Sequence, residues 1–378
     1  MKKFLIGIAR ALCVMAVCVF AGRSSPSGGS TPSGNGNQNP PSIDYGNTSD
    51  PQRTKVIAGW MDADGNIKIG SNAISKTSEV VAVPKGQQAA IAVSSSNESG
   101  ILFTTSRKVK LSSFVMSQYP VTRALFKAVM GETYFTNLGT QATANGTEDE
   151  NPVTMTNWFD AIVFCNKLSS LCHLEPVYSY DFSTDGSGKM TDPEDWFKDT
   201  TNLSETVPTS DSSTNYSNWK DKVGINLKAN GYRLPTEAEW EFCARGGDPN
   251  EEDWKYTYSG SNTYSEVAWC IETITVEGTN IVGGMSKANR LGIYDMSGNV
   301  WEWCDDYFNW TVSVDDDKYK DNEDYLVDPL GVSASSFRGL RGGSWHDDAD
   351  YGWCGLRNGV IPYARGDFYG FRLVRSSN

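Results

Sequence analysis

The sequence has little histidine and no cluster of basic residues. His173 and His346 are its two histidines among 378 residues. A histidine-rich iron site cannot be assembled from so few imidazoles. The formal net charge is −13, whereas nucleic-acid binding needs clustered Lys and Arg to neutralise phosphate groups. The composition therefore excludes nucleic acid as a partner.

Sequence signatures of covalent catalysis are also missing. No Gly-x-Ser-x-Gly segment offers a nucleophilic serine, and a lone loop histidine gives no Ser–His–Asp arrangement. No Cys-x-x-Cys pair is present. Export would permit disulfides, but the scattered spacing favours buried free thiols for most of the cysteines that follow the N-terminal segment, namely Cys165, Cys172, Cys243, Cys270, Cys304 and Cys354.

Residues 1–22 have the layout of a secretory signal peptide. Two lysines precede an apolar stretch that ends in small residues and is too short for a stable span. Cleavage after Ala21 and lipid attachment at Cys18 are alternatives, because Arg23 stands where an acylated cysteine would be expected. We predict export to the cell surface or outer membrane, with the lipid anchor left open.

Composition divides the rest of the chain. Residues 23–54 are rich in Ser, Gly, Pro and Asn, which predicts a flexible tether. Residues 55–105 form a β-rich lead-in with an Asp-Gly hairpin turn. Residues 106–378 form the main domain. A polar insertion at 181–226 is typical of a surface loop.

Three stretches of the main domain predict helices. The first follows Thr122, which can cap it. In the second, the apolar residues Trp158, Ala161, Phe164, Cys165 and Leu168 recur at helical spacing. The third begins after Pro235 and contains Ala238, Trp240 and Phe242.

Two short motifs, RGGSW from Arg341 and GFRLV ending at Val374, enclose a run from His346 to Tyr369. The run has neither strand nor helix periodicity and is expected to be a loop. Aromatic residues are mixed with Gly, Asp and Arg, as on binding surfaces. A long packed connection whose aromatics fill the core is the alternative that composition leaves open.

The motifs GYRLPTEAEWEFCARGG, LGIYDMSGNVWEWCDDYF, RGGSW and GFRLVR resemble the formylglycine-generating enzyme (sulfatase-modifying factor) family over roughly residues 112–375. The resemblance implies an α+β, C-type-lectin-like fold, irregular, with small twisted sheets and two main helices. It would also imply an oxygen-dependent oxidase that converts a sulfatase cysteine to formylglycine.

The catalytic positions of that family are altered in this chain. Its two copper-binding cysteines would fall at Gly352 and Arg357. Soft Cu(I) needs thiolates, which neither residue supplies, and Cys354 has no thiol partner five residues away. We therefore expect no copper, no catalytic residues and no enzyme, with a sulfatase-modifying oxidase as the alternative.

The resemblance also implies a structural calcium site. Asp295, the carbonyls of Gly298 and Val300, and Glu302 occupy the matching positions. Carboxylate and carbonyl oxygens suit Ca²⁺. The alternative is that both carboxylates bond backbone N–H groups or arginines without a metal.

More narrowly, the C-terminal run resembles the variable proteins of diversity-generating retroelements, which keep a fixed frame and vary other positions by mutating template adenines. The frame would be Ala349, Arg357, Pro362, Arg365, Gly370 and Phe371. Codons of that origin cannot become Lys, Glu, Gln, Met or Trp. The first four residue types are absent from 346–369. Trp353 is the exception and would be template-encoded. The variable, ligand-binding positions within 341–374 would be His346, Asp347, Asp348, Asp350, Tyr351, Gly352, Leu356, Gly359, Val360, Ile361, Tyr363, Ala364, Gly366, Asp367, Phe368 and Tyr369.

Together these features predict a surface-displayed, non-catalytic and monomeric ligand-binding protein. Its partner would be a protein or glycan on another cell. A structural surface lipoprotein without a specific ligand is the further alternative. Recoding of the C-terminal codons in sister cells separates the receptor from both alternatives.

Overall fold

The helices begin where the sequence supplies capping side chains. In the computed structural model, Thr122 Oγ1 accepts a hydrogen bond from Leu125 N (3.2 Å) at the start of α3 (Arg123–Met130), as predicted. Reciprocal capping boxes, which satisfy the first free N–H groups, open α5 (Trp158–Leu171) and α8 (Glu237–Ala244). The shorter helices are α4 (Glu132–Asn137), α9 (Tyr264–Val267) and the 3-10 turns η2 (Glu252–Lys255) and η4 (Ala349–Gly352).

The structure describes residues 81–82, 109–112, 114–138, 146–181, 189–191, 222–310, 326–332 and 334–376. The predicted signal peptide and tether lie outside these residues, as do most of the β-rich lead-in and of the polar insertion. Within the described part, no helix is long and apolar enough to cross a membrane.

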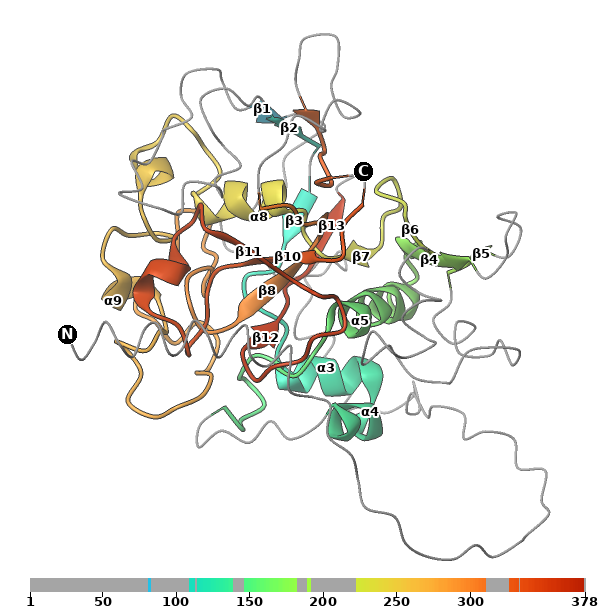
Figure 1. Ribbon diagram of the computed structural model, residues 1–378, viewed down its shortest axis with the longest axis horizontal. Helices are drawn as coiled ribbons and strands as arrows, with labels where there is room; N and C mark the ends of the chain where they lie inside the picture. Colours follow the sequence, from blue (N-terminus) through green and yellow to red (C-terminus); the bar gives the residue numbers. More distant parts are fainter. Residues whose placement is uncertain are drawn as a thin grey trace, which may run out of the picture. The chain divides into compact units, whose positions relative to one another are not determined.

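Among the described residues, four small sheets connect distant parts of the chain (Figure 1). The largest has the order β11-β10-β8-β12, with β11 (Arg357–Val360), β10 (Arg338–Arg341), β8 (Trp301–Tyr307) and β12 (Tyr369–Gly370). The other orders are β3-β13-β7, β1-β2-β9 and β5-β4-β6. Their strands are β1 (Val81–Ala82), β2 (Val109–Leu111), β3 (Phe114–Met116), β4 (Tyr178–Asp181), β5 (Lys189–Met190), β6 (Val223–Ile225), β7 (Tyr232–Arg233), β9 (Leu326–Val327) and β13 (Val374–Ser376).

Strand β8 is covered on both faces, so alternate side chains meet different layers. Glu302 accepts a hydrogen bond from Trp240 Nε1 of α8 (2.6 Å). Trp303 points the other way and donates to Thr156 O (3.0 Å), just before α5. Figure 1 shows α8 and α5 on opposite sides of these strands. Consequently β8 is buried from Trp301 to Asp306 despite its acidic residues.

The core is rich in aromatic rings. Phe126 stacks on Phe164 with centroids 5.5 Å apart, and Phe371 meets Phe164 edge-on at 5.2 Å. Such pairs add stability beyond their buried area. The GFRLV motif therefore supplies core residues, which explains why Phe371 is part of the frame.

The predicted free thiols are confirmed among the described residues. None of the six described cysteines forms a disulfide; Cys172 is half-buried, and the other five are buried. Burial raises the pKa of Cys304 well above its usual value and that of Cys354 to about 12. These side chains therefore behave as small apolar groups rather than as thiolates.

Candidate ligand-binding surface

The C-terminal run leaves the sheet at β10 and returns to it at β12. It is not wholly irregular, and the expectation of a plain loop was wrong for two segments. Ala349–Gly352 form the turn η4, and Arg357–Val360 form β11, which pairs antiparallel with β10. Backbone pairing with β10 produces this strand without any alternation of apolar side chains. Among the described strands, β11 lies at the edge of its sheet.

Burial separates the predicted frame from most predicted variable positions. Frame residues Ala349, Arg357, Pro362, Gly370 and Phe371 are buried, while Arg365 is half-buried. By contrast, His346, Asp348, Asp350 and Tyr351 are exposed. The half-buried variable positions are Asp347, Leu356, Gly359, Val360, Ile361, Tyr363, Ala364, Gly366, Asp367 and Phe368.

Two predicted variable positions do not lie on this surface. Tyr369 is 7% exposed and packs its ring 5.6 Å from that of Trp303. Gly352 is buried, and its carbonyl accepts a hydrogen bond from Ser297 Oγ (2.7 Å). Sequence could not separate them from their neighbours, because no periodicity marks which residues of an irregular run face inward.

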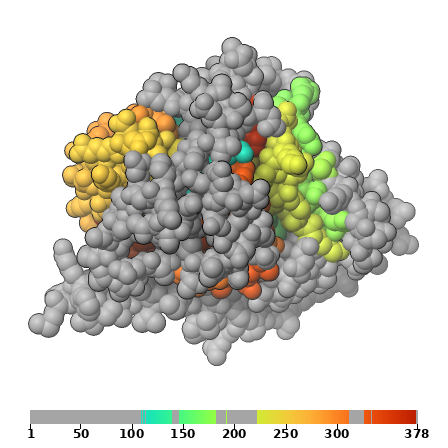
Figure 2. Space-filling model, turned by 90° about the horizontal axis from the view of Figure 1, so that it is seen from above, coloured from blue at the N-terminus to red at the C-terminus, as the bar shows by residue number. Residues whose placement is uncertain are grey.

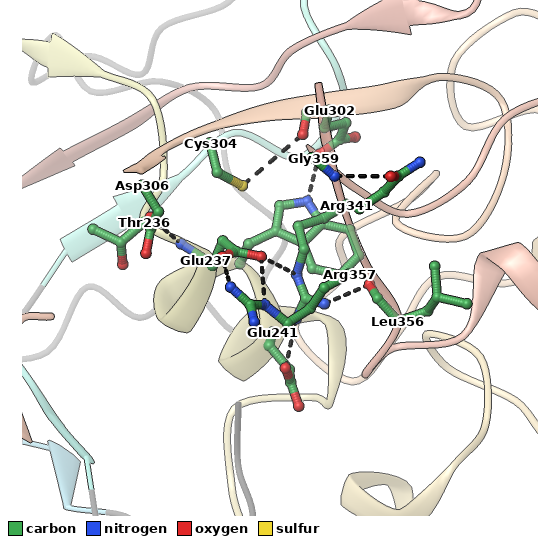
Figure 3. A network of polar contacts seen from close by, with 12 residues as sticks. Thr236, Glu237, Glu241, Glu302, Cys304, Asp306, Arg341, Leu356, Arg357 and Gly359 are labelled. Atoms are coloured by element: carbon green, nitrogen blue, oxygen red, sulfur yellow. Dashed lines mark hydrogen bonds and ion pairs between the residues drawn. The ribbon is translucent and has the colours of Figure 1, made fainter. Parts of the chain in front are cut away.

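Arg357 of the frame and Arg341 of the RGGSW motif pair with buried acids beneath the run (Figure 3). Arg357 Nε donates to Glu237 Oε1 (2.9 Å), and Nη2 donates to Glu237 Oε2. Burial alone would lower the pKa of Arg357, but the Glu237 carboxylate outweighs it and leaves that pKa raised. Arg341 binds Glu241 Oε2 (2.5 Å) and the carbonyl of Leu356 (2.5 Å). These contacts hold β11, and Leu356 just before it, against α8.

Arg365 holds the other end of the run. It pairs with both oxygens of Asp160, the acidic member of the capping box of α5, and donates to Met155 O (2.7 Å). Met155 N donates to Gly366 O (2.8 Å). The return towards β12 is therefore fixed on the start of α5.

The exposed part of the run carries acids without cationic partners. In the described ranges, no ion pair involves Asp348, Asp350 or Asp367. Asp350 has a raised pKa, first because of partial burial and then because of Glu272 and Asp348. Glu272, which sequence reasoning missed, is exposed and accepts a hydrogen bond from Ala349 N (3.0 Å). It belongs to the segment after α8, which Figure 2 shows gathered along one side of the surface in yellow to orange.

Asp347 has a different role from these acids. It accepts hydrogen bonds from Trp301 Nε1 (2.8 Å) and Ser344 Oγ. Burial raises its pKa, which these hydrogen bonds partly offset. Asp347 is therefore positioned to hold the loop rather than to project from it.

Aromatic rings lie beside the exposed acids. Tyr351 is 37% exposed and meets Trp301 edge-on at 6.3 Å. His346 stacks on Phe368 at 5.8 Å. Two exposed aromatics outside the run, Trp310 (54%) and Phe337 (37%), were also missed. Single exposed residues leave no periodic signal in a sequence.

The predicted calcium positions fit a metal only in part. Asp295 is buried; its Oδ2 accepts a hydrogen bond from Gly283 N (2.6 Å), while Oδ1 has no hydrogen-bond partner. Burial raises its pKa to about 6. Both oxygens of Glu302, however, accept hydrogen bonds from Arg372 (2.6 and 2.7 Å). Asp295 thus fits calcium, whereas Glu302 fits the metal-free alternative, and calcium stays a prediction.

These features define a class: an α+β domain in which buried Arg–carboxylate pairs support a long, partly exposed run between two strands. The chain belongs to the family of sulfatase-modifying factor enzyme 1-like domains, whose model matches residues 67–377. It is 34% identical over 141 residues to the formylglycine-generating enzyme of Streptomyces coelicolor, covering 34% of this chain and 41% of that protein. It is 37% identical over 215 residues to chaperone protein LppX of Paenibacillus barcinonensis, covering 52% and 64%. Less than two thirds of either relative is spanned.

Among solved structures, Treponema denticola variable protein 1 matches with a TM-score of 0.56 and 34% identity, over 71% of this chain and 87% of that one. The similarity to both the formylglycine-generating enzyme family and a variable protein is therefore confirmed. So is the α+β fold class.

Proposed function

We propose that the protein is a non-catalytic, surface-displayed receptor whose C-terminal run is diversified by a retroelement to vary ligand specificity. One observation carries this proposal: predicted frame residues are mostly buried, whereas most predicted variable residues reach solvent. A fold that fixes its frame internally can accept changes outside it, since surface substitutions usually alter stability by less than about half a kcal/mol. Similarity to a variable protein supports the same conclusion.

The oxidase alternative is disfavoured by what occupies the two copper positions. Arg357 is a cation paired with Glu237, and Gly352 has no side chain. Nearby Cys354 has a pKa raised to about 12 by burial, so its thiolate is disfavoured at neutral pH. Loading the purified protein with Cu(I) should leave no stoichiometric copper after desalting. A cysteine-containing sulfatase peptide should remain unoxidised.

Charge favours a protein ligand over a glycan. The run's arginines Arg357 and Arg365 are engaged with buried acids, whereas Asp348 and Asp350 face solvent. A neutral or acidic glycan offers no cation to these carboxylates. A basic protein surface would complement them and approach faster at low salt. The same proposal includes export of the protein, a ligand carried on another cell and a monomeric state.

The test is to sequence the end of the gene in many sister cells. The proposal expects replacements confined to codons of the exposed and half-buried positions, matched by adenines in a nearby near-copy beside a reverse-transcriptase gene. The frame codons should stay fixed. Uniform C-terminal codons without a near-copy would instead favour an inactive family member or a structural surface lipoprotein.

A further inference from the structure

Trp310 lies outside the C-terminal run yet is linked to it through one ring. It is 54% exposed, the largest exposed fraction among the big apolar side chains that the structure describes. Its ring meets that of Phe308 edge-on, with centroids 4.9 Å apart and planes at 88°. Phe308 is itself 2% exposed. The exposed indole therefore rests on a buried ring.

Phe308 is held in place by the frame. Its N–H donates to Phe337 O (3.0 Å), and the Arg357 guanidinium lies 4.8 Å from its ring centroid. Arg357 Nη1 also donates to Asn309 O (3.2 Å). The segment that carries Trp310 is thus tied to β11 through Arg357 and to the residue before β10 through Phe337.

Gly359, a predicted variable position on β11, faces this ring directly. A Cβ built there would lie 2.1 and 2.4 Å from two ring carbons of Phe308, well inside van der Waals contact. Any other residue at position 359 must therefore displace the Phe308 ring. Because the Trp310 ring packs against Phe308, its position must change as well. Gly352, another predicted variable position, behaves differently, because its Cβ would meet no atom closer than 3.5 Å.

We propose that Trp310 is a fixed aromatic contact of the ligand-binding surface and that the residue at position 359 sets its placement. Variation at position 359 then changes ligand specificity indirectly, because it moves the side chain of Trp310, a residue that does not itself vary. This inference rests on the proposed receptor function. The ligand feature it predicts is an apolar side chain of a protein, because exposed tryptophans that become desolvated are among the strongest interface contacts.

The coupling can be tested without a ligand. The full chain is labelled with 5-fluorotryptophan, and the Trp310 ¹⁹F resonance is assigned by its loss in Trp310→Phe. Gly359→Ala should shift or broaden that resonance, whereas the matched control Gly352→Ala should leave it in place. An unchanged resonance in a folded Gly359→Ala protein would overturn the coupling.

Binding is tested with a probe peptide selected on the wild-type protein from a random phage-displayed library and then synthesised. Trp310→Ala should weaken its binding by roughly tenfold or more. A combined replacement of His346, Asp348, Asp350 and Tyr351 by Ala should also weaken it. If only the combined replacement matters, Trp310 is not a contact and the receptor proposal survives. If neither matters, the probe binds to other residues of the protein, and both proposals lose support.

Discussion

Arg357 of β11 donates two hydrogen bonds to Glu237 of α8, from one of the two positions that the sequence resemblance assigns to copper-binding cysteines. Both side chains are buried. The pair joins β11 to α8 and so anchors the C-terminal run.

Arg357→Leu should destabilise the protein by roughly 3 to 5 kcal/mol, because it leaves the Glu237 carboxylate buried and unpaired. Asp348→Ala, in the same run but exposed, should change stability by less than about half a kcal/mol. Urea unfolding monitored by tryptophan fluorescence measures both. The double variant Arg357→Leu, Glu237→Leu should recover part of the loss. If Arg357→Leu is as stable as Asp348→Ala, the pair is not an anchor.

Replacing His346, Asp348, Asp350 and Tyr351 together should leave the fold intact, because all four are exposed. The melting temperature should stay within a few degrees of wild type. Tyr369→Ala should cost roughly 3 to 5 kcal/mol, since it removes a core ring that packs on Trp303. Unfolding of the fourfold variant would show that these residues are core, and the surface would lose its physical basis.

Sequence reasoning reached the fold mainly through local signals and a resemblance. Capping at Thr122 and the apolar spacing from Trp158 to Leu168 are local, and the structure has helices at both places. It was harder to predict which residues of the run face inward, because Tyr369 and Gly352 are buried by partners such as Trp303 and Ser297 that are distant in sequence. Such tertiary contacts leave no periodic trace.

Calcium at Asp295 predicts a chelation effect. Metal bound only to the folded state stabilises it by mass action, so EDTA should lower the melting temperature and metal analysis should find about one Ca²⁺ per chain. Asp295→Asn should abolish the difference, whereas Asp248→Asn, a surface control, should retain it. The calcium site would be ruled out by identical melting curves with and without EDTA and by the absence of calcium from the purified protein. Arg372 would then remain as the partner of Glu302.

Asp305 gives the domain a pH dependence of opposite sign to that of an ordinary ion-paired carboxylate. It is 1% exposed and accepts a hydrogen bond from Tyr178 Oη (2.6 Å), while its Oδ2 has no hydrogen-bond partner. Burial raises its pKa to about 7, an effect that Tyr178, Arg233 and Arg338 only partly offset. In the unfolded chain, the Asp305 carboxyl should titrate near its ordinary pKa of 3.8.

Between about pH 4 and 7, therefore, folded Asp305 retains a proton that the unfolded chain has lost, and the free energy of unfolding falls as pH rises. Each unit of pKa difference corresponds to about 1.4 kcal/mol. Asp305→Asn keeps an oxygen for Tyr178 but cannot ionise, so its free energy of unfolding should fall less between pH 5 and 8 than that of wild type. Asp348→Asn, at an exposed carboxylate, should retain the wild-type slope. Urea titrations across this range measure both slopes. Equal slopes in wild type and Asp305→Asn would mean that Asp305 is ionised in the folded protein at pH 5.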